Sequence, residues 1–431
     1  MRVTGPAAVE VAAPLIRSRK ALASLESHRL TRVTVVDPGT GRAIDDALCA
    51  VMRAPRSYTG EDTVEISCHG GPALARMLVE RLVGQGARLA EPGEFTRRAF
   101  LNGRLDLAQA EAVALLISAR TERAVTLAAR GIAGDLSKRL WALRQGLLEV
   151  VASLEVALDF PDDATAPDEH LVGKNINILQ DESERLLSAA RRGQVAHTGL
   201  TIAIVGPPNA GKSSLFNALL GRERAIVTPE AGTTRDVIEG TIVVSGVPIR
   251  LLDTAGIGAP RDHVDAEGMR RARHAVEESD ILVVVVDGSG SSQGPDWRFM
   301  DDLPERPHIT ALSKSDLWHR APGTTPAGVI PASVKIGGGL DALRSRLSTE
   351  VEQRSGADAD ESAIVATIRQ IELLEALSNS IRQAGTALSI HPTEISLIEL
   401  RAGLDAVSGL LGVEVGDSVL DTVFSRFCVG K

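Results

Sequence analysis

The stretch TIAIVGPPNAGKSSLFNALL at residues 201–220 decides the fold of the central part of the chain. A short apolar run leads into the pattern G-x-x-x-x-G-K-S, from Gly206 to Ser213, and a helical sequence follows at once. A strand, a glycine-rich loop and a helix in this order predict a phosphate-binding loop, because the glycines let backbone N–H groups face phosphate oxygens. Lys212 offers a positive charge to the β- and γ-phosphates, and Ser213 offers a hydroxyl to Mg²⁺.

Short apolar runs continue outward from this loop and alternate with helical stretches, which predicts an α/β domain with a mainly parallel sheet. The expected strands are residues 201–205, 241–244, 249–252, 281–286 and 309–312. Helical periodicity lies on both sides, in an apolar stripe from Leu136 to Leu154 and in residues 171–195, 364–388 and 397–411. These flanking helices indicate that the α/β domain is inserted into one discontinuous helical domain.

The N-terminal region has a pattern that differs from both the α/β and the helical parts, with short strands expected at 33–36 and 63–66 and a helix at 73–83. We therefore expect three parts. They are an α+β N-terminal domain at 1–102, a helical domain formed by 103–198 and 355–431, and the α/β domain at 199–354.

Composition limits the location and the partners of the chain. Three cysteines in 431 residues give no disulfide framework, and no segment is long and apolar enough for a membrane span, so we expect a cytoplasmic protein. The net charge of −9 gives no general attraction for nucleic acid, so an RNA partner would require a local basic patch or a basic partner protein. Aromatic residues make up 3%, which argues against extensive base-stacking surfaces.

Two further motifs fit the phosphate end of a nucleotide site. Asp253-Thr-Ala-Gly256 follows an expected strand, where Asp253 can reach Mg²⁺ through water and the Gly256 N–H can sense the γ-phosphate. Thr233 and Thr234 lie between this motif and the phosphate loop, where a mobile switch places a threonine on the metal.

Two later loops fit the base. Ser313-Lys-Ser-Asp316 follows an expected strand, as a base-contacting loop does, and Ser333-Val-Lys335 lies where a final loop would contact the base. The Asp316 carboxylate can accept two hydrogen bonds from guanine, whereas adenine offers no such pair of donors. The motifs together predict a GTPase domain. Ser313 stands where the usual N-K-x-D motif has asparagine, so we expect a looser loop and weaker affinity.

The residue after Asp-Thr-Ala-Gly is Ile257, which cannot hydrogen-bond. Ras-like GTPases have a glutamine here that orients the attacking water. Three interpretations remain open: a very slow switch, an arginine finger from a partner, or a different catalytic group.

Four longer motifs follow one another along the chain. They are SYTGEDTVEISCHGG at 57–71, PGEFTRRAFLNGRLDLAQAEA at 92–112, VTPEAGTTRD at 227–236 and CVGK at 428–431. They resemble the motifs of the tRNA-modification GTPase family known as MnmE or TrmE, within the TrmE-Era-EngA-like GTPases. The resemblance covers nearly the whole chain, and the order of the motifs makes it highly specific.

The resemblance implies an architecture and a function. The fold would be an α/β P-loop G domain inserted in a discontinuous helical domain, after an α+β folate-binding domain that also dimerises. With the FAD-containing partner MnmG, in a heterotetramer-type complex, the homodimer would install an aminomethyl-type group at C5 of the wobble uridine of certain tRNAs. A tetrahydrofolate, in its 5-formyl or methylene form, would supply the carbon.

The resemblance also implies roles in the G domain. K⁺ would be held by Asn209, Thr228, Glu230 and Thr233, and Mg²⁺ by Ser213 and Thr234. Pairing of two G domains would complete the site, and Asp265 would orient the water, with Glu267 as an alternative because an aspartate reaches less far. The GTP-binding residues would be Asn209, Ala210, Gly211, Lys212, Ser213, Ser214, Thr228, Thr233, Thr234, Asp253, Thr254, Ala255, Gly256, Lys314, Asp316 and Ser333, of which Asn209 and Lys212 would be catalytic.

For folate, the resemblance implies Arg2, Glu65, Arg104 and Lys431, with Arg104 in place of the family's lysine. Arginine keeps the positive charge but changes the hydrogen-bond geometry. If the C-terminal tail reaches this pocket, Cys428 lies near the carbon donor. A catalytic thiolate and a purely structural thiol both remain open for Cys428.

The chain starts some twenty residues later than the family pattern, so we expect either a start codon assigned too late or a lost edge of the folate domain. A second functional hypothesis is a GTP-switched ribosome-assembly or RNA-chaperone factor, which would bind RNA without modifying it. That hypothesis gives no role to the Cys-Val-Gly-Lys ending or to the motif that contains Glu94.

Overall fold

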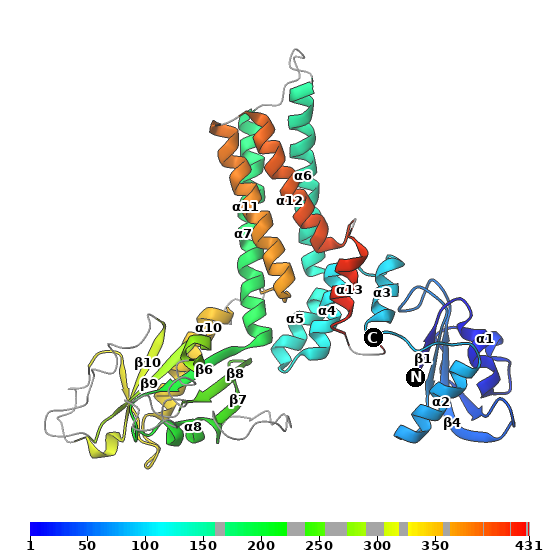
Figure 1. Ribbon diagram of the computed structural model, residues 1–431, viewed down its shortest axis with the longest axis horizontal. Helices are drawn as coiled ribbons and strands as arrows, with labels where there is room; N and C mark the ends of the chain where they lie inside the picture. The colour runs from blue at the N-terminus through cyan, green and yellow to red at the C-terminus, as the bar shows by residue number, and fades with distance from the viewer. Residues whose placement is uncertain are drawn as a thin grey trace. The chain divides into compact units, whose positions relative to one another are not determined.

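A computed structural model describes residues 1–159, 169–221, 238–254, 274–289, 306–318, 326–356, 363–390, 392–413, 415–427 and 430. The chain forms two compact units (Figure 1). The first contains Met1–Ala114, Gly131–Gln180 and Leu373–Lys431, and the second contains Leu115–Arg130 and Asp181–Glu372.

The first unit begins with an antiparallel sheet in the order β1-β5-β4-β3-β2. Its strands are β1 (Arg2–Thr4), β2 (Ile16–Arg17), β3 (Thr31–Val36), β4 (Ala43–Met52) and β5 (Thr63–Ser67). Alternate residues such as Val33, Cys49 and Ile66 are buried, because one face of the sheet packs on a core shared with α1 (Ala8–Ala12) and α2 (Pro72–Gly84). The other face carries polar side chains such as Arg32 and Asp46.

Helices make up the rest of the first unit, and the long ones run side by side in Figure 1. α12 packs along α6, where Arg144 Nε donates to Ser408 Oγ at 3.2 Å and Arg401 pairs with Glu155 at 2.6 Å. The helices are α3 (Glu94–Leu101), α4 (Leu107–Ser118), α6 (Asp135–Asp159), α7 (Glu169–Thr198), α11 (Ile368–Ile390), α12 (Thr393–Leu411) and α13 (Asp417–Phe424), and parts of α4, α7 and α11 belong to the second unit.

The second unit contains a sheet in the order β11-β10-β9-β6-β8-β7, parallel except for β7. Its strands are β6 (Leu200–Val205), β7 (Ile238–Val244), β8 (Val247–Asp253), β9 (Ile281–Asp287), β10 (His308–Ser313) and β11 (Val329–Pro331). α8 (Lys212–Leu220) and α10 (Leu340–Ser355) pack on one face through Phe216 and Leu343, and a second apolar cluster around Ala275 and Val284 covers the other. α5 (Glu122–Ile132) lies largely in this unit.

The expected strands of the α/β domain are confirmed, as is the inserted arrangement, because β6 follows α7 directly and the chain returns to α11 after α10. The helix expected at 364–388 begins at Ile368 instead. Residues 363–367 are not helical, and the Ile364 N–H donates to the Ala189 carbonyl on α7 at 3.2 Å. No helix among the described residues is long and apolar enough to cross a membrane.

Gly193 on α7 makes this contact possible, because a Cβ there would lie 2.0 Å from the Ile364 carbonyl oxygen. We expect Gly193→Ala to cost roughly 1–3 kcal/mol of unfolding free energy, since the backbone at 364 would have to move. Gly173→Ala on the same helix is the control. A Cβ at Gly173 has nothing within 4 Å, so the change should be neutral or slightly stabilising. Urea unfolding followed by circular dichroism checks both, and equal stability of the two variants would contradict the close contact.

Candidate functional site

The carboxyl ends of the parallel strands bring the predicted nucleotide motifs to one edge of the second unit's sheet. The phosphate loop follows β6, Asp253 ends β8, Ser313 ends β10, and Ser333 comes just after β11. β6 pairs in parallel with both β8 and β9, so the chain leaves all three strands at the same edge. This edge is therefore the candidate nucleotide-binding site.

The phosphate loop depends on glycine for its close approach to β9. Gly206 has φ 155°, and a Cβ there would lie 2.3 Å from the Val285 carbonyl oxygen. Gly211 has φ 94° and caps α8, so the N–H groups of the first turn face the loop. Asn209 also has a left-handed backbone, φ 62°, and its side chain is exposed to solvent. An exposed amide at this place can ligate a cation or a phosphate.

Lys212 lies folded against its own loop, where its Nζ donates to the Pro207 carbonyl at 3.0 Å. Burial lowers the pKa of Lys212, and the Asp253 carboxylate partly opposes that shift. A buried cation with a single carbonyl partner remains able to interact with phosphate oxygens.

Two of the residues expected around Mg²⁺, Ser213 and Asp253, are described, and their chemistry fits that ion. Asp253 is 5% exposed, and its Oδ1 accepts no hydrogen bond from any described residue. A buried carboxylate oxygen without a partner is unfavourable, so a bound cation or its water would satisfy it. Ser213 lies in the first turn of α8 with its side chain exposed. The Thr254 hydroxyl does not face this site with a free proton, because its Oγ1 donates to the Ile204 carbonyl at 2.8 Å.

Ser313 joins the base-contacting loop to the phosphate loop. Its hydroxyl lies 2.5 Å from the Ala210 carbonyl oxygen and 3.1 Å from the Val286 carbonyl oxygen, and its one proton can be donated to either. Serine in place of asparagine predicts a looser loop here. The hydrogen bond to Ala210 provides a direct connection between the two loops despite the missing amide.

Lys314 has a left-handed backbone, φ 51°, and its Nζ pairs with Asp287 Oδ2 at 2.6 Å. Burial opposes ionisation of Asp287, but hydrogen bonds from Lys314 and Ser289 lower its pKa. Asp287 was not predicted from the sequence, although its position directly after the buried strand β9, at the same edge as the other motifs, was an available signal.

Asp316 and Ser333 lie together, as their predicted shared role requires. Ser333 is buried, and its hydroxyl donates to Asp316 Oδ1 at 2.6 Å. This hydrogen bond lowers the pKa of Asp316, so the carboxylate stays ionised and able to accept hydrogen bonds from a guanine edge.

Several predicted residues lie outside the described part of the chain. They are Thr228, Glu230, Thr233, Thr234, Ala255, Gly256, Ile257, Asp265, Glu267, Cys428 and Lys431.

Two of the residues predicted to bind folate meet in the first unit. Arg2 and Glu65 are paired across β1 and β5, with Arg2 Nε 2.6 Å from Glu65 Oε1. The Arg2 guanidinium also lies over the rings of Tyr58 and Phe95, at 5.7 and 5.6 Å. Arg2 lines a hollow of about 420 Å³ that Gly430 also reaches. A cationic, partly aromatic wall of this kind suits a flat anionic ligand.

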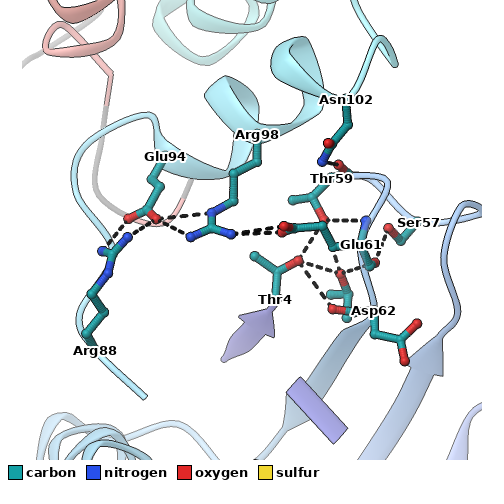
Figure 2. Close-up of polar contacts among 10 residues, drawn as sticks. Thr4, Ser57, Thr59, Glu61, Asp62, Arg88, Glu94, Arg98 and Asn102 are labelled. Atoms are coloured by element: carbon teal, nitrogen blue, oxygen red, sulfur yellow. Dashed lines mark hydrogen bonds and ion pairs between the residues drawn. The ribbon is translucent and has the colours of Figure 1, made fainter. Parts of the chain in front are cut away.

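Arg104 does not line that hollow. Its side chain is exposed and lies beside Gly60, which belongs to the loop between β4 and β5. The same loop is held from two sides in Figure 2. Thr4 Oγ1 lies 2.6 Å from Thr59 Oγ1, and Asn102 Nδ2 donates to the Thr59 carbonyl at 2.7 Å. The S-Y-T-G-E-D motif therefore connects β1 to the end of α3.

A chain of charges runs from Arg88 to Glu61 across the start of α3, as Figure 2 shows. Glu94 accepts hydrogen bonds from Arg88 at 2.8 Å and from Arg98 at 2.9 Å, and Arg98 also binds both Glu61 oxygens at 3.0 and 3.1 Å. Burial opposes ionisation of Glu94, but hydrogen bonds from Arg88, the Glu91 N–H and Arg98 lower its pKa to about 2. No role was predicted from the sequence for these four side chains.

We expect Ser313→Ala to weaken GDP and GTP binding by roughly threefold to tenfold, because the link between the loops is worth about 1 kcal/mol. Ser315→Ala is the control, since Ser315 lies in the same loop and its side chain forms no hydrogen bond with any described residue. Ser313→Asn should keep near-wild-type affinity. Isothermal titration with GDP measures all three, and unchanged affinity in Ser313→Ala would show that the Ala210 contact has no energetic role.

We expect Glu94→Gln to destabilise the first unit by on the order of 2–3 kcal/mol at pH 7, from the depressed pKa of a carboxylate that is mostly buried. A lowered folded-state pKa stabilises above the unfolded value, about 4.3, and this contribution is lost as pH falls toward 2. The gap between wild type and variant should therefore narrow below about pH 4. Unfolding measured between pH 7 and 3 checks this. The exposed Glu91→Gln is the control, and a constant gap across this range would contradict the linkage.

Comparison with known proteins agrees with the motifs and the fold. The chain matches the family models "GTP-binding protein TrmE N-terminus" over residues 1–104 and "MnmE helical domain" over residues 107–428. It is 38% identical to the tRNA modification GTPase MnmE of Carboxydothermus hydrogenoformans, with 100% of this chain and 96% of the relative covered. It is 41% identical to that of Symbiobacterium thermophilum at the same coverage.

Among solved structures, Era of Aquifex aeolicus is 25% identical, with 42% of this chain and 66% of that chain covered at a TM-score of 0.30. The G domain of the FeoB iron transporter of T. maritima is also 25% identical, with 36% of this chain and 99% of that chain covered at a TM-score of 0.28. The two family models together account for nearly the whole chain, from its first strand to α13. The chain belongs to the MnmE (TrmE) family of tRNA-modification GTPases.

Proposed function

We propose that this chain hydrolyses GTP to drive the modification of C5 of the wobble uridine in certain tRNAs. The observation that carries the proposal is the meeting of a phosphate loop, an unpartnered Asp253 oxygen and the Asp316–Ser333 pair at one sheet edge, in a chain of this family. The functional boundaries that we propose are 1–102 for the folate domain, 103–198 with 355–431 for the helical domain, and 199–354 for the G domain.

In this proposal the chain's own groups act on the two ends of GTP. Asp316 accepts hydrogen bonds from guanine, and Lys314 is held beside the base by Asp287. Lys212 exchanges its Pro207 carbonyl partner for phosphate oxygens, and the α8 N–H groups bind the same phosphates. Ser213, Thr234 and Asp253 would hold Mg²⁺, with Asp253 acting through water.

Cation activation replaces the glutamine that Ile257 cannot supply. Asn209, Thr228, Glu230 and Thr233 would hold K⁺, and Asp265, or Glu267, would orient the attacking water. When bound, K⁺ and Mg²⁺ offset the negative charge that develops between the β- and γ-phosphates. The left-handed backbone of Asn209 and its exposed amide support this role. Two G domains of a homodimer would face each other to enclose the site.

We propose that the first unit binds a tetrahydrofolate, in the 5-formyl or methylene form, beside Arg2. The Arg2–Glu65 pair, the two rings under the guanidinium and the adjacent hollow support this location. Gly430 lines the hollow. We therefore include its neighbours in the proposal, with Lys431 as a folate contact and Cys428 near the carbon donor. The FAD-containing MnmG would be the partner in the modification of tRNA in the cytoplasm. Arg104 lies outside the hollow beside Arg2, so its contact with folate stays a prediction from the resemblance alone.

The test is the rate of GTP hydrolysis in KCl against the same concentration of NaCl. We expect K⁺ to raise the rate roughly tenfold or more, since a positive charge at the developing negative charge is worth at least that much. Asn209→Ala should lower the rate in K⁺ to the rate in Na⁺. Asn217→Ala, on the helix after the loop, is the matched control and should behave as wild type. Equal low rates in both salts for the wild-type chain would favour a slow switch or an arginine finger.

A further inference from the structure

An open hollow of about 920 Å³ lies beside the short edge strand β2 of the first unit's sheet. β2, the turn after it, β3 and one residue of β4 form its walls, and the buried residues Leu25 and Val33 belong to its lining. It shares no residue with the nucleotide site or with the hollow beside Arg2. The functions proposed above do not use it.

The lining of this hollow is strongly basic. Its cations are Arg17, Arg19, Lys20, Arg29 and Arg32, and its carboxylates are Glu26 and Asp46. Five positive charges against two negative charges leave a net +3, whereas the whole chain carries −9. A chain that repels polyanions overall therefore attracts them at this place.

Both carboxylates of the hollow are already neutralised. Glu26 pairs with Arg29 at 2.6 Å, and Asp46 pairs with Arg32 at 3.0 Å. In the part of the chain that the structure describes, Arg17, Arg19 and Lys20 form no salt bridge, although Arg17 Nη1 donates to the Gly41 carbonyl at 3.5 Å. The excess charge is therefore concentrated on three neighbouring residues.

The backbone presents these groups on one side. Arg17 is opposite Thr34 on β3, and Thr34 is opposite Asp46 on β4, so these three side chains share a face of the sheet. Past β2 the Ser18 hydroxyl donates to the Lys20 carbonyl, which fixes the turn that carries Arg19 and Lys20. All three cations are exposed to solvent. These cations therefore lie on a paired strand and its hydrogen-bonded turn, and not on a frayed end of the chain.

We propose that this hollow binds the phosphate backbone of the tRNA on which the enzyme acts. The inference rests on the proposed function, since it takes tRNA as the substrate. Arginine and lysine side chains without a salt bridge are groups that contact phosphates, and the lining contains no aromatic residue on which a base could stack. The hollow therefore positions the tRNA without reading its sequence.

The test compares two full-length triple variants with the same change of charge. R17Q/R19Q/K20Q removes the unpaired cations of the hollow. R56Q/R76Q/K138Q removes two arginines and one lysine that are exposed on the first unit outside the hollow. Fluorescence anisotropy with labelled tRNA gives the Kd at several KCl concentrations, and circular dichroism and GTP hydrolysis report folding and basal activity.

We expect the hollow variant to bind tRNA roughly tenfold or more weakly at about 0.1 M salt, with basal GTP hydrolysis unchanged. The slope of log K against log[salt] should fall in magnitude by about 2, because each lost phosphate contact lowers it by about 0.7–0.9. The control variant should stay within about twofold of wild type. At matched ionic strength, inorganic phosphate should compete no better than chloride, because a polyanion contacts several cations at once.

Equal weakening of tRNA binding in both triple variants would overturn the proposal, because the loss would then reflect the change in net charge alone. Competition by millimolar phosphate at matched ionic strength would also overturn it, in favour of a site for a small anion. A hollow variant with control-like tRNA affinity but a lost complex with the FAD-containing partner would overturn it in favour of a protein interface. Each of these results is independent of the K⁺ test, so failure of the hollow and failure of the proposed GTPase mechanism can be told apart.

Discussion

The parallel pairing of β6 with β8 and β9 is the constraint on which the nucleotide site depends. Its register sets Ile204 opposite Asp253 on one side and Val283 on the other, so the loops after these strands leave the sheet together. A shift by one residue would turn the buried residues of β6 to the opposite face. The two faces of the sheet oppose that shift, because Ile204 packs in the core cluster of one face and the smaller Val205 packs in the cluster of the other.

Close backbone contacts then bring the loops within reach of short side chains. A Cβ at Gly206 would lie 2.3 Å from the Val285 carbonyl oxygen, and one at Gly288 would lie 2.5 Å from the Ser313 carbonyl oxygen. At such distances a serine hydroxyl is long enough to join Ser313 to Ala210. The departure from asparagine is thus accommodated by glycine packing on both sides. Asp287 adds a charged contact that holds Lys314 from the neighbouring strand.

The sequence predicted well what depends on local pattern. The strands of the second unit are continuous apolar runs because both faces are buried, and α7 follows its helical periodicity. Contacts between residues far apart in the chain could not be predicted from local pattern. The apolar run at 363–366 has a helical pattern in the sequence, but in the structure it packs as non-helical chain against Ala189 and Gly193 of α7. The pair of Asp287 and Lys314 spans 27 residues, and the cations of the basic hollow become neighbours only through β2 and β3.

The hydrogen bond from Ser333 to Asp316 has a consequence for the binding of guanine. The Ser333 hydroxyl donates to Asp316 Oδ1 within the protein, which orients the carboxylate before any nucleotide is present. An ionised carboxylate has about four lone-pair sites, so the same side chain can still accept both hydrogen bonds from guanine. Because the acceptor is already ordered, little side-chain conformational entropy is lost when guanine binds.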